Sequence, residues 1–243
     1  MKTLHKLLFL FFITINFNLL GQSFWELQRD KGYYFEFGFN TLGSVDYTSN
    51  QNLESTSSPS DLFQTRLEVG YKLRASKRIN FSLGFFSGSH SYYNNVFVPI
   101  DSETDLEIQS LFDLNFIGAN IGMDHALFKI KYGKTKLDRI TLSANVRLAA
   151  SFLRNGTRTD EPIDSPSTII SNETTNLLLT DFRSFWTNLQ YGYILSYRAS
   201  YLIGINFRHH INSNLSSIET SSESYKFKSH SFSLGLIIYP WSL

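Results

Sequence analysis

The 243 residues of the sequence include no cysteine, only 5 prolines, and no run of 18 consecutive apolar residues. Without cysteine there is no disulfide framework, no Cys-ligated metal site and no lipidated cysteine anchor. Without a long apolar run, no transmembrane helix is expected in the mature chain. Charged residues make up only 18%, and 22 Lys and Arg balance 21 Asp and Glu. This balance speaks against a nucleic-acid partner.

Aromatic residues are abundant instead, at 16% of the chain, which argues against intrinsic disorder. The N-terminus has the layout of a secretory signal peptide, with a basic segment around Lys2, the apolar run Leu7–Ile13 and the small residue Gly21 before a cleavage site. We therefore expect a signal peptide over residues 1–21 and a single domain over residues 22–243.

The mature chain is dominated by apolar and polar residues that alternate with a period of two, which predicts strands with one apolar face. In residues 32–40, for example, three phenylalanines alternate with Glu36, Gly38 and Asn40. Eight strand regions are expected, at residues 32–40, 62–73, 78–88, 104–123, 138–153, 181–196, 200–212 and 225–241. The fourth region changes parity, which predicts a β-bulge near Phe116–Gly118.

The connections between these strands alternate in length. Those at 75–77 and 197–199 are short, and the long polar connections are at 41–61, 89–103, 154–180 and 213–224. Residues 124–136 form either a long turn or an extension of the hairpin. This alternation and the even strand count are typical of outer-membrane barrels, with short periplasmic turns and long extracellular loops. We predict an all-β fold, a transmembrane antiparallel up-and-down β-barrel of eight strands. A secreted β-sandwich is the alternative.

An eight-stranded barrel has an interior that side chains can fill, so a packed polar lumen is predicted rather than a channel. The expected lumen residues are Glu36, Arg66, Glu68, Lys72, Asn145, Arg147, Asn188 and Arg208. The expected lipid-facing residues are Phe35, Phe37, Phe39, Phe81, Phe85, Phe185, Phe207 and Phe232, together with Phe112 and Phe116. Tyrosines and a tryptophan near strand ends are candidates for aromatic girdles: Tyr33, Tyr34, Tyr71, Tyr191, Tyr193, Tyr197, Tyr201, Tyr239 and Trp241.

The chain resembles the small eight-stranded outer-membrane proteins of Gram-negative bacteria. Its ending, residues 233–241, is similar to the C-terminal signal read by the barrel-assembly machinery, although Tyr239 and Trp241 are one place out of register. The Phe-, Asn- and Ser-rich composition and the Gly21–Gln22 cleavage context resemble Bacteroidota outer-membrane proteins. The resemblance implies an integral outer-membrane location with both termini periplasmic. Its implied partners are outer-membrane lipid, other outer-membrane proteins and, during biogenesis, the assembly machinery.

The two ends of the predicted barrel differ in charge. The long loops are acidic, and the connection after the fourth strand is basic, with Lys129, Lys131, Lys134 and Lys136. This periplasmic basic turn is either a surface for an anionic partner or lipid headgroups, or a solvated rim without a partner.

One weak catalytic pattern is present. The stretch around His210 and Ser213 resembles that of outer-membrane lipid A deacylases, which implies His210 as base, Ser213 as nucleophile and Glu223 as the orienting carboxylate. One extra residue separates the histidine from the serine, which on a continuous strand puts them on opposite faces. No cofactor or metal site is expected.

The sequence favours a non-enzymatic integral outer-membrane barrel that serves as an accessory or structural subunit of an outer-membrane assembly, such as secretion, uptake or barrel-insertion machinery. The alternative is a stand-alone, surface-exposed barrel that presents adhesive or protective loops. A lipid A deacylase-like hydrolase is the weaker alternative.

Overall fold

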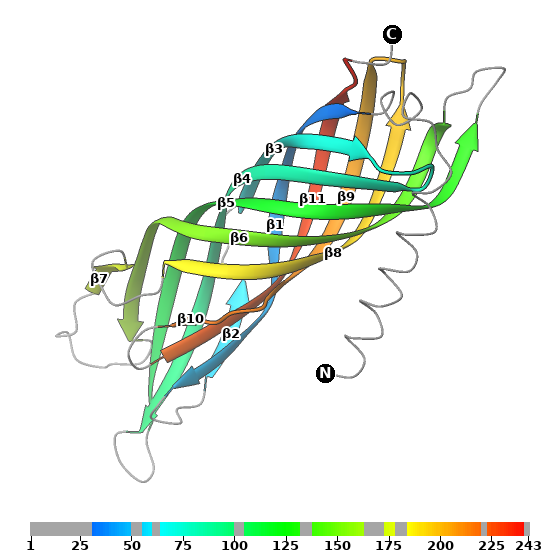
Figure 1. Cartoon of the computed structure of the whole chain (residues 1–243). Coiled ribbons are helices and arrows are strands. Elements are labelled where there is room, and N and C mark those ends of the chain that lie inside the picture. Colours follow the sequence, from blue (N-terminus) through cyan, green and yellow to red (C-terminus); the bar gives the residue numbers. More distant parts are fainter. Residues whose placement is uncertain are drawn as a thin grey trace.

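The computed structural model describes residues 31–49, 55–59, 64–99, 105–131, 138–162, 173–177, 184–219 and 223–240. The predicted signal peptide, residues 1–21, lies outside these ranges. The described strands form one antiparallel sheet (Figure 1). They are β1 (Gly32–Ser49), β2 (Ser55–Pro59), β3 (Thr65–Arg74), β4 (Ile79–Pro99), β5 (Asp105–Lys131), β6 (Asp138–Pro162), β7 (Glu173–Asn176), β8 (Phe185–Arg198), β9 (Ile203–Asn214), β10 (Ile218–Glu219) and β11 (Glu223–Ile238).

Eight of these strands close into a ring. Their order is β1-β3-β4-β5-β6-β8-β9-β11, and β1 pairs with β11 from Tyr33↔Ile238 to Ser49↔Glu223. The short strands β2, β7 and β10 pair with β4, β6 and β11 outside the ring order. The all-β, antiparallel up-and-down barrel of eight strands is therefore confirmed. A β-sandwich has open edges, which this ring lacks.

A belt of exposed apolar side chains surrounds the ring, and all eight ring strands contribute to it. On β6 this apolar belt runs from Ile140 to Phe152, which at about 3.3 Å per residue is roughly 40 Å of strand. With a strand tilt of about 45°, its height is about 28 Å, close to the thickness of a bilayer core. The most exposed members are Phe85, Leu234, Ile121, Phe128 and Tyr193. The ring is thus a membrane-spanning barrel, because closure satisfies its backbone in lipid.

Three of the strands adjoining the long loops are much longer than predicted. β1 continues to Ser49, β4 to Pro99 and β6 to Pro162. Residues 41–49, 89–99 and 154–162, which open the predicted loops 41–61, 89–103 and 154–180, are therefore strand. The backbone beyond the apolar belt stays paired with neighbouring strands, which is why regular structure continues there. We call this part the extension, and the end of the barrel that carries it the loop end (Figure 1).

The opposite end, which we call the turn end, carries the short connections, and there β1 begins and β11 ends (Figure 1). Both short turns contain the sequence Arg-Ala-Ser, at 74–76 and 198–200. In each turn the serine hydroxyl accepts two backbone N–H groups, for Ser76 at 3.2 and 3.1 Å and for Ser200 at 3.2 and 3.1 Å. A serine hydroxyl that bonds to the turn backbone explains why the four residues between the strands, 75–78 and 199–202, suffice to reverse the chain.

The parity switch predicted within residues 104–123 does not occur. On β5 the residues at even positions face inward throughout, from Ser110 to Asp124. What changes is the kind of side chain inside, which is apolar near the loop end and polar near the turn end. The irregularity lies on the partner strand, where Asn115 pairs with Asn155 and Phe116 with Leu153, so that Arg154 is the bulged residue.

The loop-end half of the lumen is filled by aromatic and aliphatic side chains, which we call the aromatic plug. Tyr92 stacks on Phe112 with ring centroids 4.8 Å apart, and Phe116 packs edge-on against Trp186 at 5.8 Å. The remaining members include Phe86, Leu114, Leu153, Leu177, Tyr225 and Phe227. The prediction that Phe112 and Phe116 face lipid, and that the lumen is polar throughout, was therefore wrong. Beyond the apolar belt water lies outside the wall, so the hydrophobic effect draws aromatic side chains inward.

Residues 124–131 extend strand β5 rather than forming a turn. A second bulge interrupts this extension, because Ala126 pairs with Ser143 and Phe128 with Leu142, leaving Leu127 without a partner. A bulge changes which face later residues occupy. Phe128 therefore joins Leu127 on the lipid side, and Lys129 turns toward the lumen.

Replacing Ile121 with arginine tests the apolar belt. Ile121 lies between Leu83 and Leu148 in the register and is 60% exposed, so its replacement puts a charge into lipid near mid-belt. We expect Ile121→Arg to lower the free energy of unfolding by about 2–4 kcal/mol in guanidinium titrations of the barrel in lipid vesicles. The control Asn155→Arg, beyond the belt, is expected to change it by less than about 0.5 kcal/mol. Equal losses in the two variants contradict the belt.

Candidate functional site: a filled and charged lumen

Glu68 on β3 is the centre of a charged layer in the middle of the lumen. Arg66 Nη2 lies 2.8 Å from its Oε2, and Arg147 Nη1 contacts its Oε1. Arg208 Nη1 is 3.4 Å from the same Oε1, and the Tyr34 hydroxyl donates to it at 2.8 Å. Side chains from β1, β3, β6 and β9 thus converge on one carboxylate, and they tie opposite walls of the barrel together.

Two further ion pairs adjoin this centre. Arg208 also contacts Glu36, and Lys72 Nζ lies 2.6 Å from Asp124 Oδ2. The Asn145 amide donates a hydrogen bond to Asp124. Buried charges are tolerated when they are paired, and each charged side chain of this layer lies against one of opposite sign.

The lumen accommodates Tyr34 because two glycines face it. A Cβ at Gly84 would overlap the Tyr34 hydroxyl, and a Cβ at Gly70 would overlap the Tyr34 ring. Small barrels fill their interior by alternating small and large residues in this way. Arg66 links the charged layer to the aromatic plug, since its guanidinium lies 4.3 Å above the Phe86 ring.

The structure buries all eight side chains that the sequence assigned to the lumen, with 9% exposure or less. Six belong to the ion pairs above, Asn145 bonds to Asp124, and Asn188 donates to the Ser151 hydroxyl at 3.1 Å. They are Glu36, Arg66, Glu68, Lys72, Asn145, Arg147, Asn188 and Arg208.

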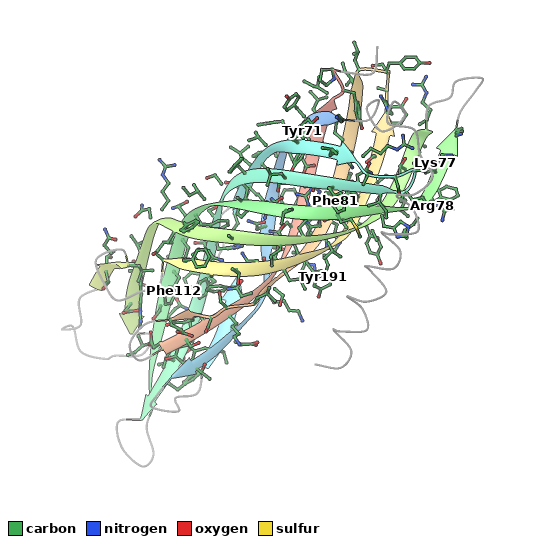
Figure 2. All side chains as sticks on the ribbon, viewed as in Figure 1. Tyr71, Lys77, Arg78, Phe81, Phe112 and Tyr191 are labelled. Carbon is green, nitrogen blue, oxygen red and sulfur yellow. The ribbon has the colours of Figure 1, made fainter. Side chains whose placement is uncertain are left out.

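The eight phenylalanines of the lipid-facing set lie on outward positions. Five are 44–62% exposed, namely Phe35, Phe37, Phe39, Phe85 and Phe207, and three are half-buried, namely Phe81, Phe185 and Phe232. Among the girdle candidates, Tyr33, Tyr71, Tyr191, Tyr193, Tyr197 and Tyr201 are exposed or half-buried. Tyr34 and Tyr239 are buried in the lumen instead, and Trp241 lies outside the described residues. Tyr71 and Tyr191 are labelled in Figure 2.

On the loop-end side of the aromatic plug, Arg158 forms ion pairs with two acidic residues. Its Nε is 2.7 Å from Asp160 and its Nη1 is 3.0 Å from Glu223. The Tyr225 hydroxyl donates to Glu223 at 2.7 Å. Burial, with the neighbouring Tyr92 and Glu223, raises the pKa of Tyr225, so that its hydroxyl stays protonated and remains a donor.

The three deacylase candidates are not brought together. His210 is buried and faces the lumen, whereas Ser213 lies on the outward face of the same strand. Glu223 lies eight residues along β11 from Ser231, the partner of His210, which is roughly 26 Å at about 3.3 Å per residue. Glu223 bonds to Arg158 and Tyr225 instead. Among the described residues, no three His, Asp or Glu side chains form a group suited to a metal ion.

The basic residues predicted in the fourth connection lie partly on β5. Lys129 faces the lumen mouth and donates to the Lys77 carbonyl at 2.6 Å, and Lys131 is exposed at the strand end. Lys134 and Lys136 lie outside the described residues. Lys77 and Arg78 lie at the turn end of the barrel, whereas Phe112 lies in the opposite half (Figure 2).

Two features of this lumen were missed from the sequence. Asp124 was assigned to a connection, although its even position on the strand of Asn120 and Gly122 signals an inward side chain. The repeated Arg-Ala-Ser was also missed, although its occurrence in both short turns is visible in the sequence. Arg74 and Arg198, the arginines of this motif, both line the mouth of the lumen.

Removing the central carboxylate tests the charged layer. Glu68→Ala leaves Arg66, Arg147 and Arg208 with one acceptor fewer in a buried site, so the free energy of unfolding should fall by about 3–5 kcal/mol. The measurement is equilibrium guanidinium unfolding in vesicles, followed by tryptophan fluorescence. The matched variant Glu161→Ala, at an exposed position of the extension, should stay within about 0.5 kcal/mol of the parent. A Glu68→Ala barrel as stable as the parent refutes the central role of this residue.

No protein-family model and no curated protein matches the chain. Several solved structures share its general form. Neisserial surface protein A is 12% identical, over 85% of this chain and 96% of that one, with a TM-score of 0.39. OprG from Pseudomonas aeruginosa is 10% identical, over 85% and 94%, with a TM-score of 0.40. Ail of Yersinia pestis, solved with the heparin analogue sucrose octasulfate, is 10% identical, over 85% and 97%, with a TM-score of 0.35.

A Bacteroidota origin stays a prediction from composition.

The class of the protein follows from its own geometry. The ring is closed, and its belt is apolar and as high as a bilayer core is thick. Its lumen is filled by paired charges and by the aromatic plug, and one end has short turns while the other has long connections. These are the properties of an integral β-barrel of the bacterial outer membrane, and this chain is such a barrel.

Proposed function

We propose that the chain is a stand-alone outer-membrane barrel that presents its extension at the cell surface and catalyses no reaction. The observation that carries this proposal is the length of the extension. β4 continues to Pro99 although Phe85 is its last member of the apolar belt, which is roughly 45 Å of strand at about 3.3 Å per residue. A barrel that only had to anchor itself in lipid would have no use for this length.

The extension is packed inside and joined at its rim, so it can hold a binding surface in a fixed shape. Its interior is the aromatic plug, and its rim is joined by Arg158, Asp160 and Glu223. A binding surface on rigid strands loses less entropy on binding than one on mobile loops. The rigid extension therefore supports an adhesive or protective surface rather than loops that only connect strands.

The filled lumen disfavours transport. Within the described residues, the charged layer around Glu68 and the aromatic plug occupy successive levels of the barrel. An eight-stranded barrel is narrow enough for side chains to close it, so a solute would have to break several buried ion pairs to pass. A filled lumen is equally compatible with an accessory role and with surface presentation.

Epitope tags test the orientation and exposure on which the proposal depends. A tag inserted between Pro99 and Asp105, at the loop end, should bind antibody on intact cells. A tag inserted within residues 132–137, at the turn end, should bind antibody only after the outer membrane is permeabilised. The second insertion is the matched control, because both tags interrupt connections next to β5. Labelling of the second tag but not the first on intact cells overturns the proposal.

An accessory role remains the second candidate, because the lipid-facing surface is not uniformly convex. Between β1, β3, β4 and β11 lies an apolar groove of about 450 Å³. Its walls include Tyr33, Phe35, Val69, Tyr71, Leu83, Phe85, Leu236 and Ile238. In lipid, close packing rather than hydrophobicity drives association, and a groove lined with aromatic rings offers a shape into which a neighbouring barrel can fit.

Mild detergent extraction and affinity purification separate the two candidates. A stand-alone barrel is recovered as a monomer in native mass spectrometry. If a partner barrel occupies the groove, the partner is recovered too, and Phe85→Ala should reduce its recovery at least about fivefold by removing a groove wall. Phe152→Ala on β6 is the matched control, since Phe152 is 51% exposed to lipid but lies away from the groove. A partner lost equally in both variants excludes the groove as its site.

A further inference from the structure

The apolar groove on the lipid-facing wall is lined by two successive rows of outward side chains. In the register, each row crosses β11, β1, β3 and β4. The row nearer the turn end is Ile238, Tyr33, Tyr71 and Leu83, and the row nearer the loop end is Leu236, Phe35, Val69 and Phe85. The lining also includes Tyr34 and Gly70, which belong to the inward face of their strands. The groove therefore reaches down to the strand backbone between the outward side chains.

The groove lies within the apolar belt, so in a bilayer it opens onto acyl chains. Surface atoms without a partner lose their dispersion contacts, and a narrow, flexible acyl chain can follow the groove and restore them. The hydrophobic effect does not favour this step, because the chain is surrounded by hydrocarbon before and after it. Selectivity for one kind of lipid must therefore come from the headgroup.

The turn between β3 and β4 lies at the level where that headgroup is expected. One outward row, formed by Leu73 and Phe81, separates the groove from this turn. From Tyr71 to Ala75, the first residue of the turn, the chain advances four residues, which is roughly 9 Å of depth at about 3.3 Å per residue and a tilt of about 45°. The headgroup region of one leaflet is about 5–8 Å thick. A phospholipid with a chain in the groove thus has its phosphate beside the turn.

Two exposed cations of this turn are available to the phosphate. Lys77 and Arg78 lie next to each other at the turn end of the barrel (Figure 2). Hydrogen bonds hold their backbone, because the Lys77 carbonyl accepts from Lys129 and the Arg78 N–H donates to the Ser76 hydroxyl at 3.2 Å. Their side chains form no ion pair or hydrogen bond with any residue that the structure describes. The positive charge of this turn is therefore not neutralised by the described part of the chain.

We propose that the groove and the turn together bind one anionic phospholipid of the inner leaflet. One acyl chain lies in the groove, the Arg78 guanidinium bonds to two phosphate oxygens at once, and Lys77 adds a second positive charge. Each cation near a membrane surface attracts anionic lipid, so a net negative headgroup is favoured over a zwitterionic one. The choice of leaflet rests on the orientation in the proposed function, with the turn end in the periplasm. A lipid held here occupies the place that the second candidate function gives to a partner barrel.

Native mass spectrometry of the barrel released from nanodiscs tests the headgroup contacts. In nanodiscs with increasing fractions of phosphatidylglycerol in phosphatidylcholine, one phosphatidylglycerol should be retained on each barrel. Lys77→Gln should weaken this retention about fivefold, and the double variant Lys77→Gln/Arg78→Gln about 25-fold, since each cation contributes a similar attraction. Lys228→Gln, which changes an exposed lysine of β11 at the loop end, is the control and should retain lipid like the parent. All three positions are exposed, so the variants are expected to fold.

Filling the groove tests the position of the acyl chain. Val69→Trp puts an indole ring into the groove, whereas Val146→Trp puts one on β6, at a lipid-facing position that does not line it. The two valines are matched, because they are 49% and 43% exposed. Val69→Trp should abolish the retention of phosphatidylglycerol, and Val146→Trp should leave it unchanged.

Several results overturn the proposal. Equal retention of phosphatidylcholine and phosphatidylglycerol excludes the anionic headgroup, and retention that survives Val69→Trp excludes the groove. Absence of retained lipid, or equal loss in a variant and its control, excludes the site as a whole. Recovery from cells of a partner barrel that Phe85→Ala releases assigns the groove to that barrel instead. Retention in nanodiscs does not depend on orientation in cells, so a failure here is distinguishable from a failure of the epitope-tag experiment.

Discussion

A lipid bilayer offers no water to an unpaired backbone amide or carbonyl, so the pairing of β1 with β11 is the contact on which the rest of the molecule depends. Once the ring is closed, alternate residues of every membrane-spanning strand face lipid and the others face a narrow lumen. The residues that face lipid form the apolar belt, and those that face the lumen form the charged layer around Glu68. Closure also fixes which strands are neighbours, and therefore which side chains from distant parts of the chain can meet, as Tyr34, Arg147 and Arg208 do.

The lumen changes character along its axis because the surroundings of the wall change. Inside the belt, the outer face must be apolar, so the polar side chains of the strands are turned inward, where the charged ones are paired. In the extension, water surrounds the wall, and the inward face becomes the only dry place available. The aromatic plug forms there for the same reason that a soluble domain forms a core. Arg66, stacked on Phe86 and paired with Glu68, lies at the boundary between these two regimes.

The strand count, the closed architecture and the direction of most side chains could be predicted because a period of two is strong in regions such as 32–40 and 138–153. The interior of the extension could not, because Phe112 and Phe116 look the same in sequence whether they face lipid or a dry lumen. Bulges at Arg154 and Leu127 were also beyond prediction, since each depends on how a strand registers with its partner. Asp124 and the Arg-Ala-Ser turns were within reach, because parity and a repeated tripeptide are properties of the sequence alone.

The Arg154 bulge has a consequence for how this barrel can change over evolution. Beyond it, Arg158 and Asp160 face inward and reach Glu223 and Ser110. If Arg154 were instead part of the regular pairing, strand alternation would turn both side chains to the outside. Arg154 itself has no partner in the register, because Leu153 and Asn155 pair with the consecutive residues Phe116 and Asn115. Loss of Arg154 would therefore restore a regular ladder and leave every side chain from Asn155 to Pro162 on its present face. The wall can thus accommodate a single inserted residue as a bulge, whereas a single residue inserted into the regular pairing would exchange the inner and outer faces beyond it.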